Sequence, residues 1–239
     1  MSRIVFMVPA YNESESLPGT IADLREHYPK TDIIVINDGS TDGTAEAALG
    51  LEVTLLDLPF NLGIGGAVQT GLLYAARQGY DIAVQFDGDG QHRADEVSKL
   101  LRAIQSGQCD AVIGSRFLAP SQYRPPLMRR IGIAAFNAVN SLILSRRISD
   151  STSGFRAYNR KTIEFLAQNY PHDYPEPESV MILCRSGFRI LEVQVEMRER
   201  QNGQSSITFL RSSYYMCKVM LAILIGATRR PLRRPTDEI

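Results

Sequence analysis

The 239-residue chain has no tryptophan, only three cysteines, and no excess of charge of either sign. Cys109, Cys184 and Cys217 lie far apart without a Cys-x-x-Cys pair, which argues against a disulfide framework or a zinc site and fits a reducing compartment. The 26 basic and 26 acidic residues balance, so we expect no nucleic-acid partner. The first residues show no secretory signal pattern, so we expect a cytoplasmic protein.

Long apolar runs are also missing. The run at 219–225 falls well short of the ~20 residues that a membrane-spanning helix needs, and Arg229, Arg230, Arg233 and Arg234 follow it. We expect an amphipathic helix at about 207–227, whose basic flank suits the inner face of the cytoplasmic membrane and a peripheral protein. The alternative is a helix that packs on the protein's own core or on another subunit.

Short apolar runs alternate with segments of helical periodicity over the first 120 residues. Strands are predicted at 4–8, 33–36, 53–56, 82–86 and 111–114, and helices at 17–28, 44–49, 63–77 and 94–104. Strands that are apolar throughout and separated by helices indicate an α/β fold with a mostly parallel sheet covered by helices on both faces. The second half is less regular, with helices predicted at 128–144 and 177–184 and strands at 155–158 and 188–195.

Polar segments follow four of these strands, at 9–13, 37–40, 86–90 and 114–117. In parallel sheets, ligands bind beyond the carboxyl ends of the strands. The sequence therefore predicts a binding site that these segments form together.

The segment Asp87-Gly88-Asp89 places two carboxylates one residue apart, directly after a buried strand. The glycine between them permits close approach of a ligand. Such oxygen ligands suit Mg²⁺ or Mn²⁺, and a divalent ion can stabilise the charge that develops on a departing diphosphate. The alternative is a polar turn that only ends the strand.

Four segments occur in order: Val8-Pro9-Ala10-Tyr11-Asn12-Glu13, then 37–44, 61–67 and 86–92. Together they resemble the family 2 glycosyltransferases of the GT-A fold, and most of all the dolichol-phosphate mannosyltransferase-like branch, which transfers a sugar to a polyprenyl phosphate. The resemblance covers residues 4 to about 206. It implies metal-dependent, inverting transfer from a nucleotide sugar, which could be UDP-, GDP- or dTDP-linked. No Gly-x-Gly-x-x-Gly follows the first strand, which argues against a nicotinamide-binding enzyme.

On this resemblance we expect a GT-A domain at 1–206, with a nucleotide-sugar half at 1–120 and an acceptor half at 121–206. The amphipathic helix and basic tail at 207–239 would contact a membrane surface or a membrane-protein partner.

The resemblance also implies roles on the donor side. Pro9, Tyr11 and Glu13 would line the nucleoside pocket, and Asp38 would bond the base or ribose. Gly65 lies in a glycine-rich helix start that would face the phosphates, or else it only lets that helix pack tightly.

The metal would be bound by Asp89 and Gln91, as in the Asp-x-Asp-x-Gln-His pattern of that branch. Asp87 would lie beside the ribose and diphosphate and would be a further ligand.

On the acceptor side, the resemblance implies that Arg116, Ser153 and Arg156 hold the donor diphosphate or the acceptor phosphate. The alternative for the two arginines is a solvated surface position. Arg200 would contact the diphosphate from a loop that closes over the donor. Ser206 stands where the mannosyltransferase pattern usually has lysine, which weakens the assignment to that exact activity.

Glu178 resembles the family carboxylate near the acceptor, and Glu176 is the second candidate. A hydroxyl acceptor needs such a base, whereas a phosphate acceptor is already anionic. Either glutamate could instead stabilise a helix start through its charge. Two other functions stay open: transfer to a hydroxyl of a polysaccharide or glycolipid, and catalytically silent binding of a nucleotide sugar.

Overall fold

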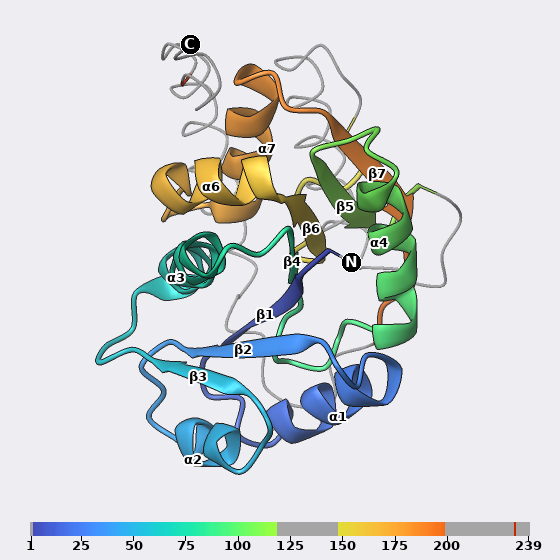
Figure 1. Cartoon of the computed structure of the whole chain (residues 1–239). Helices are drawn as coiled ribbons and strands as arrows, with labels where there is room; N and C mark the ends of the chain where they lie inside the picture. Colours follow the sequence, from blue (N-terminus) through green and yellow to red (C-terminus); the bar gives the residue numbers. More distant parts are fainter. Residues whose placement is uncertain (1, 119–147, 199–231, 233–239) are drawn as a thin grey trace, which may run out of the picture.

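A seven-stranded sheet runs through the described part of the chain, with helices on both faces (Figure 1). The computed structural model describes residues 2–118, 148–198 and 232. The strand order is β3-β2-β1-β4-β6-β5-β7. The helices predicted at 128–144 and at about 207–227, together with Arg200, lie outside the described residues.

The first half follows the predicted alternation closely. Its strands are β1 (Ile4–Ala10), β2 (Asp32–Asn37), β3 (Thr54–Asp57), β4 (Ile82–Gln85) and β5 (Ala111–Ser115). Its helices are α1 (Leu17–His27), α2 (Thr44–Leu49), α3 (Gly63–Gln78) and α4 (Val97–Gln105), with a 3₁₀ turn η1 (Ala94–Glu96) before α4. All these strands pair in parallel where they meet each other, so the predicted α/β fold is confirmed.

The second half adds the one antiparallel strand among those described. β6 (Arg156–Asn159) runs antiparallel between β4 and β5, and β7 (Ile190–Gln194) pairs in parallel with β5. The sheet is therefore mostly parallel, as predicted. Helix α7 (Pro175–Arg185) begins two residues before the predicted start, and helix α6 (Arg160–Asn169) was not predicted at all.

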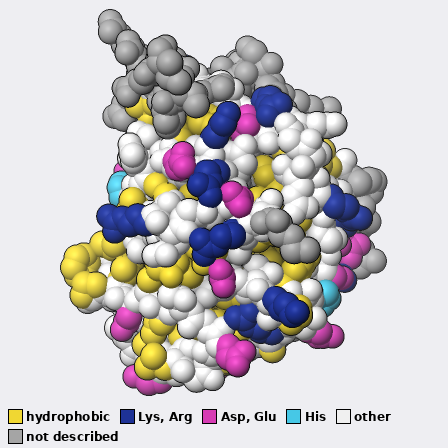
Figure 2. Space-filling view, in the orientation of Figure 1, with side chains coloured by type: hydrophobic (Ala, Val, Ile, Leu, Met, Phe, Trp, Pro, Cys, Tyr) yellow, Lys and Arg dark blue, Asp and Glu magenta, His cyan; other side chains and the backbone are white. Residues whose placement is uncertain are grey.

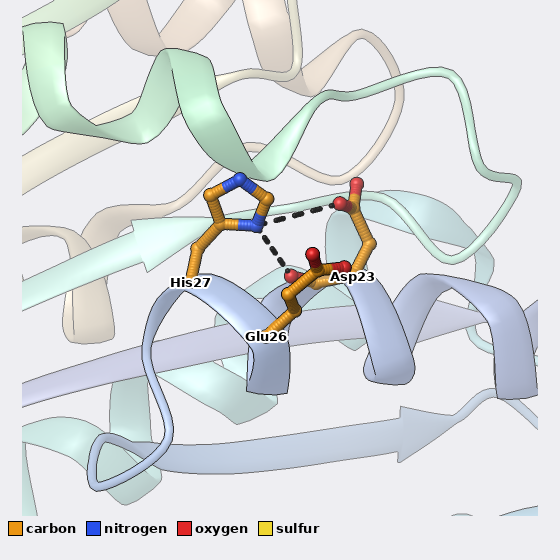
Figure 3. A group of neighbouring side chains, drawn as sticks. All are labelled: Asp23, Glu26 and His27. Atoms are coloured by element: carbon orange, nitrogen blue, oxygen red, sulfur yellow. Dashed lines mark hydrogen bonds and ion pairs between the residues drawn. The ribbon is translucent and has the colours of Figure 1, made fainter.

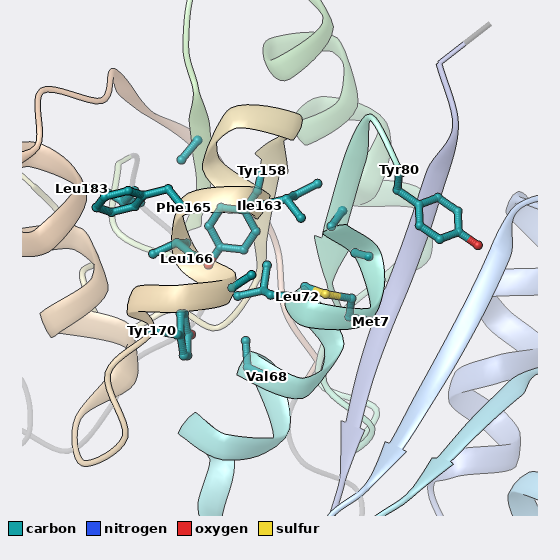
Figure 4. Packing of buried hydrophobic residues seen from close by; sticks show 14 of the residues in the cluster. Met7, Val68, Leu72, Tyr80, Tyr158, Ile163, Phe165, Leu166, Tyr170 and Leu183 are labelled. Carbon is teal, nitrogen blue, oxygen red and sulfur yellow. The ribbon is translucent and has the colours of Figure 1, made fainter. Parts of the chain in front are cut away.

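Each face of the sheet has its own hydrophobic core, because successive strand residues point to opposite faces. Helices α3, α6 and α7 cover one face, where Met7, Leu72, Ile163 and Leu183 pack together (Figure 4). Helices α1, α2 and α4 cover the other face through residues such as Leu24. Within the described residues, no helix is both long enough and apolar enough to cross a membrane.

The surface carries few extended patches of one kind on the face shown in Figure 2, where basic and acidic side chains are interspersed. Large apolar side chains are exposed at the loop before α3 and at its first turn, namely Phe60, Leu62 and Ile64.

The strand register brings the polar segments to one edge. Ala10 at the end of β1 pairs with Asn37 at the end of β2, and Gln85 at the end of β4 pairs with Arg156 at the start of β6. Arg156 also pairs with Ile113 of β5. The loops after β1, β2, β4 and β5, and the loop before β6, therefore meet at this edge.

Asp110 fastens the opposite edge of the sheet. Its carboxylate accepts hydrogen bonds from the backbone N–H of Arg189 at 2.8 Å, from the Arg189 guanidinium at 3.2 Å, and from Asn159 Nδ2 at 3.1 Å. Burial alone would raise the pKa of Asp110, but these hydrogen bonds outweigh it and lower the pKa below its usual value. The ionised carboxylate therefore stabilises the folded state.

We expect Asp110→Asn to lower the free energy of unfolding at pH 7 by about 2 kcal/mol, because the replaced hydrogen bonds involve a charge. A carboxylate with a lowered pKa stabilises the fold above its unfolded pKa of about 4, and this contribution disappears as the pH falls through the folded pKa. The difference between the variant and the wild type should therefore shrink toward about pH 3 in urea titrations.

Asp81→Asn is the matched control, since Asp81 pairs with Arg160 on the surface with 41% of its side chain exposed. It should cost less than about 1 kcal/mol. If Asp110→Asn lowered the free energy of unfolding equally at pH 7 and at about pH 3, the charge of Asp110 would contribute nothing to stability.

Candidate active site

The turn after β4 carries the three predicted metal ligands. The Asp87 side chain is 32% exposed, and its backbone N–H donates to His92 Nδ1 at 3.0 Å. The Gly88 N–H donates to the carbonyl of Pro9 at 3.2 Å, and the Gln91 N–H donates to Asp89 Oδ1 at 3.0 Å. Two partly exposed carboxylates and an amide are hard oxygen ligands, so the donor set fits Mg²⁺ or Mn²⁺.

His92 supports this turn from beneath. It is only 3% exposed, and its ring stacks on Phe155 with 4.6 Å between centroids. Burial lowers the pKa of His92 to about 4, so the ring is neutral. Because Nδ1 accepts from the Asp87 backbone, the proton lies on Nε2, which is 3.6 Å from Asp87 Oδ2. His92 thus contacts both ends of Asp87, a role that sequence reasoning missed.

The charge of Asp87 is balanced by two arginines. Burial raises the pKa of Asp87 above its usual value, and the nearby charge of Glu13 acts in the same direction. The side chain of Gln85, with Nε2 at 3.4 Å from Asp87 Oδ1, and the charges of Arg156 and Arg116 oppose this rise. A divalent ion at this position would add to the effect of the arginines.

The first polar segment lies against the same turn. Pro9 is buried at the end of β1, whereas the Tyr11 side chain is 47% exposed. The Ser16 hydroxyl lies 2.5 Å from Glu13 Oε2 and 2.9 Å from the carbonyl of Gly88. The structure therefore brings Glu13 and the Asp87–Asp89 turn together, as the sequence predicted for this edge.

Asp38 and Gly65 hold the start of helix α3 in place. Asp38 is 3% exposed, and its Oδ1 accepts the backbone N–H of Leu62 at 2.7 Å. Burial raises the pKa of Asp38 despite this bond. A side chain at Gly65 would place Cβ 2.6 Å from the carbonyl oxygen of His172, so this glycine permits close helix packing. The nucleotide contacts expected of both residues stay predictions.

Arg116 is firmly held by a buried carboxylate. Its Nε and Nη2 donate to the two oxygens of Asp150 at 2.7 and 2.8 Å, and Nη2 also donates to Thr152 Oγ1 at 3.0 Å. Asp150 is fully buried, and 17% of the Arg116 side chain is exposed. Arg116 is therefore not a solvated surface arginine, and its charge reaches Asp87 from a fixed position.

Ser153 and Arg156 are both buried, at 1% exposure each. Ser153 Oγ accepts the backbone N–H of Phe155 at 3.2 Å, and the Arg156 guanidinium donates to carbonyl oxygens and to Ser179. Neither side chain reaches the surface in this arrangement. Arg156 is therefore not a solvated surface arginine, and the phosphate contacts that the resemblance implies for both residues stay predictions.

Gly154 lies directly against the Asp87–Asp89 turn. A side chain there would place Cβ 2.7 Å from Asp87 Oδ2 and 3.1 Å from Gln85 Nε2. Only glycine allows the loop before β6 to approach Asp87 so closely. This contact joins the loop before β6 to the Asp87–Asp89 turn and was not predicted.

Both candidate glutamates lie in the first turn of α7 and are half-buried. Burial raises the pKa of Glu176 above its usual value, the charge of Arg156 opposes this, and the charge of Asp87 adds to it. Glu176 thus interacts electrostatically with both Asp87 and Arg156. Sequence reasoning ranked it second.

A separate group of possible ligands, Asp23, Glu26 and His27, lies on α1 (Figure 3). Asp23 Oδ2 accepts from the Ala94 N–H at 3.2 Å and from Arg198 Nη1 at 2.9 Å, and His27 Nδ1 lies 3.6 Å from Asp23 Oδ1. These contacts account for the positions of Asp23 and His27.

We expect Gly154→Ala to weaken Mn²⁺ binding by about tenfold, because the new methyl group displaces the Asp87 carboxylate. Electron paramagnetic resonance of free Mn²⁺ would measure the affinity. Gly19→Ala is the control, since a Cβ there meets nothing within 4 Å inside helix α1. It should leave Mn²⁺ affinity unchanged and raise stability by about 0.5–1 kcal/mol. An unchanged Mn²⁺ affinity in Gly154→Ala would contradict the proposal that the Asp87 carboxylate, positioned against Gly154, binds the metal.

The chain is similar in sequence to several enzymes that transfer sugars to polyprenyl phosphates. An undecaprenyl-phosphate mannosyltransferase of Micrococcus luteus is 31% identical over 216 residues, which cover 86% of this chain and 88% of the relative. A polyprenol monophosphomannose synthase of Mycolicibacterium smegmatis is also 31% identical, over 86% of this chain and 81% of that protein. A UDP-N-acetylglucosamine–dolichyl-phosphate N-acetylglucosaminyltransferase of Methanococcus voltae is 30% identical over 81% of this chain and 84% of that protein.

Solved structures show the same fold. Glucosyl-3-phosphoglycerate synthase from Mycobacterium tuberculosis, in complex with Mn²⁺, uridine diphosphate and phosphoglyceric acid, matches with a TM-score of 0.72 at 20% identity. The match covers 97% of this chain and 80% of that chain. The same enzyme with Mg²⁺ and uridine diphosphate matches with a TM-score of 0.71.

The sequence profile of the family described as "Glycosyl transferase family 2" matches residues 5–166, so this chain belongs to glycosyltransferase family 2.

Proposed function

We propose that this glycosyltransferase moves a sugar, in a metal-dependent and inverting reaction, from a nucleotide sugar to a polyprenyl phosphate at the cytoplasmic face of a membrane. The observation that carries the proposal is the meeting of the Asp87–Asp89 turn, Glu13 and Arg116 at one edge of the sheet. The relatives named for transfer to undecaprenyl, polyprenol and dolichyl phosphates support the acceptor class.

Asp89, Gln91 and Asp87 would hold Mg²⁺ or Mn²⁺, which when bound stabilises the negative charge of the departing diphosphate. His92 keeps Asp87 oriented through the backbone N–H and the carboxylate. Because His92 is neutral, it adds no positive charge that would compete with the metal.

The nucleoside would lie along the first polar segment. The exposed ring of Tyr11 can pack on a base, and Glu13 can accept hydrogen bonds from ribose hydroxyls. Asp38 orders the neighbouring backbone at Leu62 and would contact the base or ribose from the side of α3.

The acceptor phosphate would approach from the side of Arg116, whose guanidinium is oriented by Asp150. Because Nε and Nη2 already donate to Asp150, Arg116 would attract the phosphate through its positive charge. Arg200, outside the described residues, would contact the diphosphate, and the helix at about 207–227 would bind the membrane surface or a membrane-protein partner.

A second candidate is transfer to a hydroxyl of a polysaccharide or glycolipid. It is favoured by Glu176, because burial raises its pKa and a carboxylate with a raised pKa is a stronger general base. The acceptor oxygen of a phosphate, in contrast, attacks without losing a proton.

We expect Asp89→Asn to lower donor turnover at least about 100-fold, because the charge that holds the metal is lost. Transfer to polyprenyl phosphate and hydrolysis of UDP, GDP and dTDP sugars would be measured with Mn²⁺ and with a chelator. Asp95→Asn is the control, because Asp95 pairs with Arg93 on the surface. Nucleotide binding that needs no metal, without turnover of any donor, would show a silent binding protein instead.

Glu176→Gln and Glu178→Gln distinguish the two acceptor classes. With a phosphate acceptor, either change should lower kcat less than about tenfold, because no proton has to be removed. With a hydroxyl acceptor, loss of the base should cost about 10²–10⁴-fold. Glu164→Gln on α6 is the control for loss of a carboxylate elsewhere. A loss of the larger size with polyprenyl phosphate as acceptor would contradict the proposed acceptor.

A further inference from the structure

Arg156 is a buried charge with an unusual set of partners. It begins β6 and is 1% exposed, and it is among the largest fully buried side chains of the described residues. A guanidinium removed from water is costly unless its N–H groups are all hydrogen bonded. Its presence at this edge therefore needs a reason beyond packing.

Four hydrogen bonds enclose the guanidinium. Nε donates to the Ser153 carbonyl at 2.7 Å, and Nη2 donates to the carbonyls of Ser151 at 2.9 Å and Glu176 at 2.8 Å. Nη1 donates to Ser179 Oγ at 2.7 Å. All four acceptors are uncharged, so these contacts satisfy four of the five N–H groups without neutralising the charge.

These acceptors belong to two different segments. Ser151 and Ser153 lie in the loop before β6, whose next residue, Gly154, lies against the Asp87 carboxylate. Glu176 and Ser179 lie in the first two turns of α7. Arg156 therefore joins the 151–154 loop, which lies against the Asp87–Asp89 turn, to the helix that carries Glu176.

The charge of Arg156 also acts on both neighbouring carboxylates. It opposes the rise that burial causes in the pKa of Asp87 and in that of Glu176. Two half-buried carboxylates near each other repel, and a buried positive charge between their segments offsets this repulsion.

We propose that Arg156 is a positioning residue and not a phosphate contact: it holds the 151–154 loop and the start of α7 so that Asp87 is oriented for the divalent ion. This inference rests on the proposed function of the Asp87–Asp89 turn. It assigns to Arg156 an effect on metal binding that exists before any acceptor arrives.

The test compares Arg156→Met and Arg156→Lys with Arg189→Met in the full chain. Arg189 is a suitable control because it also joins strands by several hydrogen bonds, but with Asp110 and Gly107 at the other edge of the sheet. Mn²⁺ affinity, hydrolysis of the donor without acceptor, and the KM for polyprenyl phosphate are measured for each.

A positioning role predicts that Arg156→Met weakens Mn²⁺ binding and acceptor-free hydrolysis by about 10–100-fold while the acceptor KM changes little. Arg156→Lys should recover part of the Mn²⁺ affinity, because it keeps the charge. Arg189→Met should change neither quantity. A raised acceptor KM with normal Mn²⁺ affinity and hydrolysis would overturn the proposal and make Arg156 a phosphate contact.

Ser179→Ala decides the question if the Arg156 variants do not fold, because it removes a single acceptor of the guanidinium. It should weaken Mn²⁺ affinity and acceptor-free hydrolysis together by about threefold, a smaller form of the same effect. Unchanged Mn²⁺ affinity in Ser179→Ala would overturn the proposal. A wild-type protein without Mn²⁺-dependent donor turnover would instead contradict the proposed function itself.

Discussion

The half-buried carboxylate of Asp87 at the end of β4 is the constraint on which the rest of the site depends. A carboxylate at this depth is unfavourable unless positive charge or hydrogen bonds compensate it. The protein supplies the charges of Arg116 and Arg156 and a hydrogen bond from the Gln85 amide. His92 is held neutral below, so the remaining positive charge can come from a metal.

Each compensating group is fixed by a partner of its own. Both carboxylate oxygens of Asp150 accept hydrogen bonds from Arg116. Arg156 donates to carbonyl oxygens of the loop before β6 and of α7. The antiparallel strand β6 makes this arrangement possible, because it begins at the edge where β4 ends and so places the loop before it at that edge. Residues from the first and the second half of the chain thus meet at the Asp87 carboxylate.

Local features of the fold and site could be predicted from the sequence. The strands β1 and β2 are continuous apolar runs because both of their faces are covered, and the carboxylates of Asp87 and Asp89 are neighbours in the chain. Helix α6 was missed because it follows β6 directly and opens with Arg160 and Lys161. Its one clear signal was Asn159, whose side chain accepts the Thr162 N–H as a cap. The burial of Arg156 and the contact of Gly154 with Asp87 depend on residues that are far apart in the sequence. No local sequence pattern could therefore predict them.

A crystal structure of the protein with Mn²⁺ and a nucleotide sugar, with anomalous diffraction recorded at the manganese edge, tests the central role of the Asp87–Asp89 turn most directly. We expect one anomalous peak beside the Asp87 and Asp89 carboxylates, in contact with the diphosphate of the donor. A nucleotide bound elsewhere, with no manganese at this turn, would contradict that role.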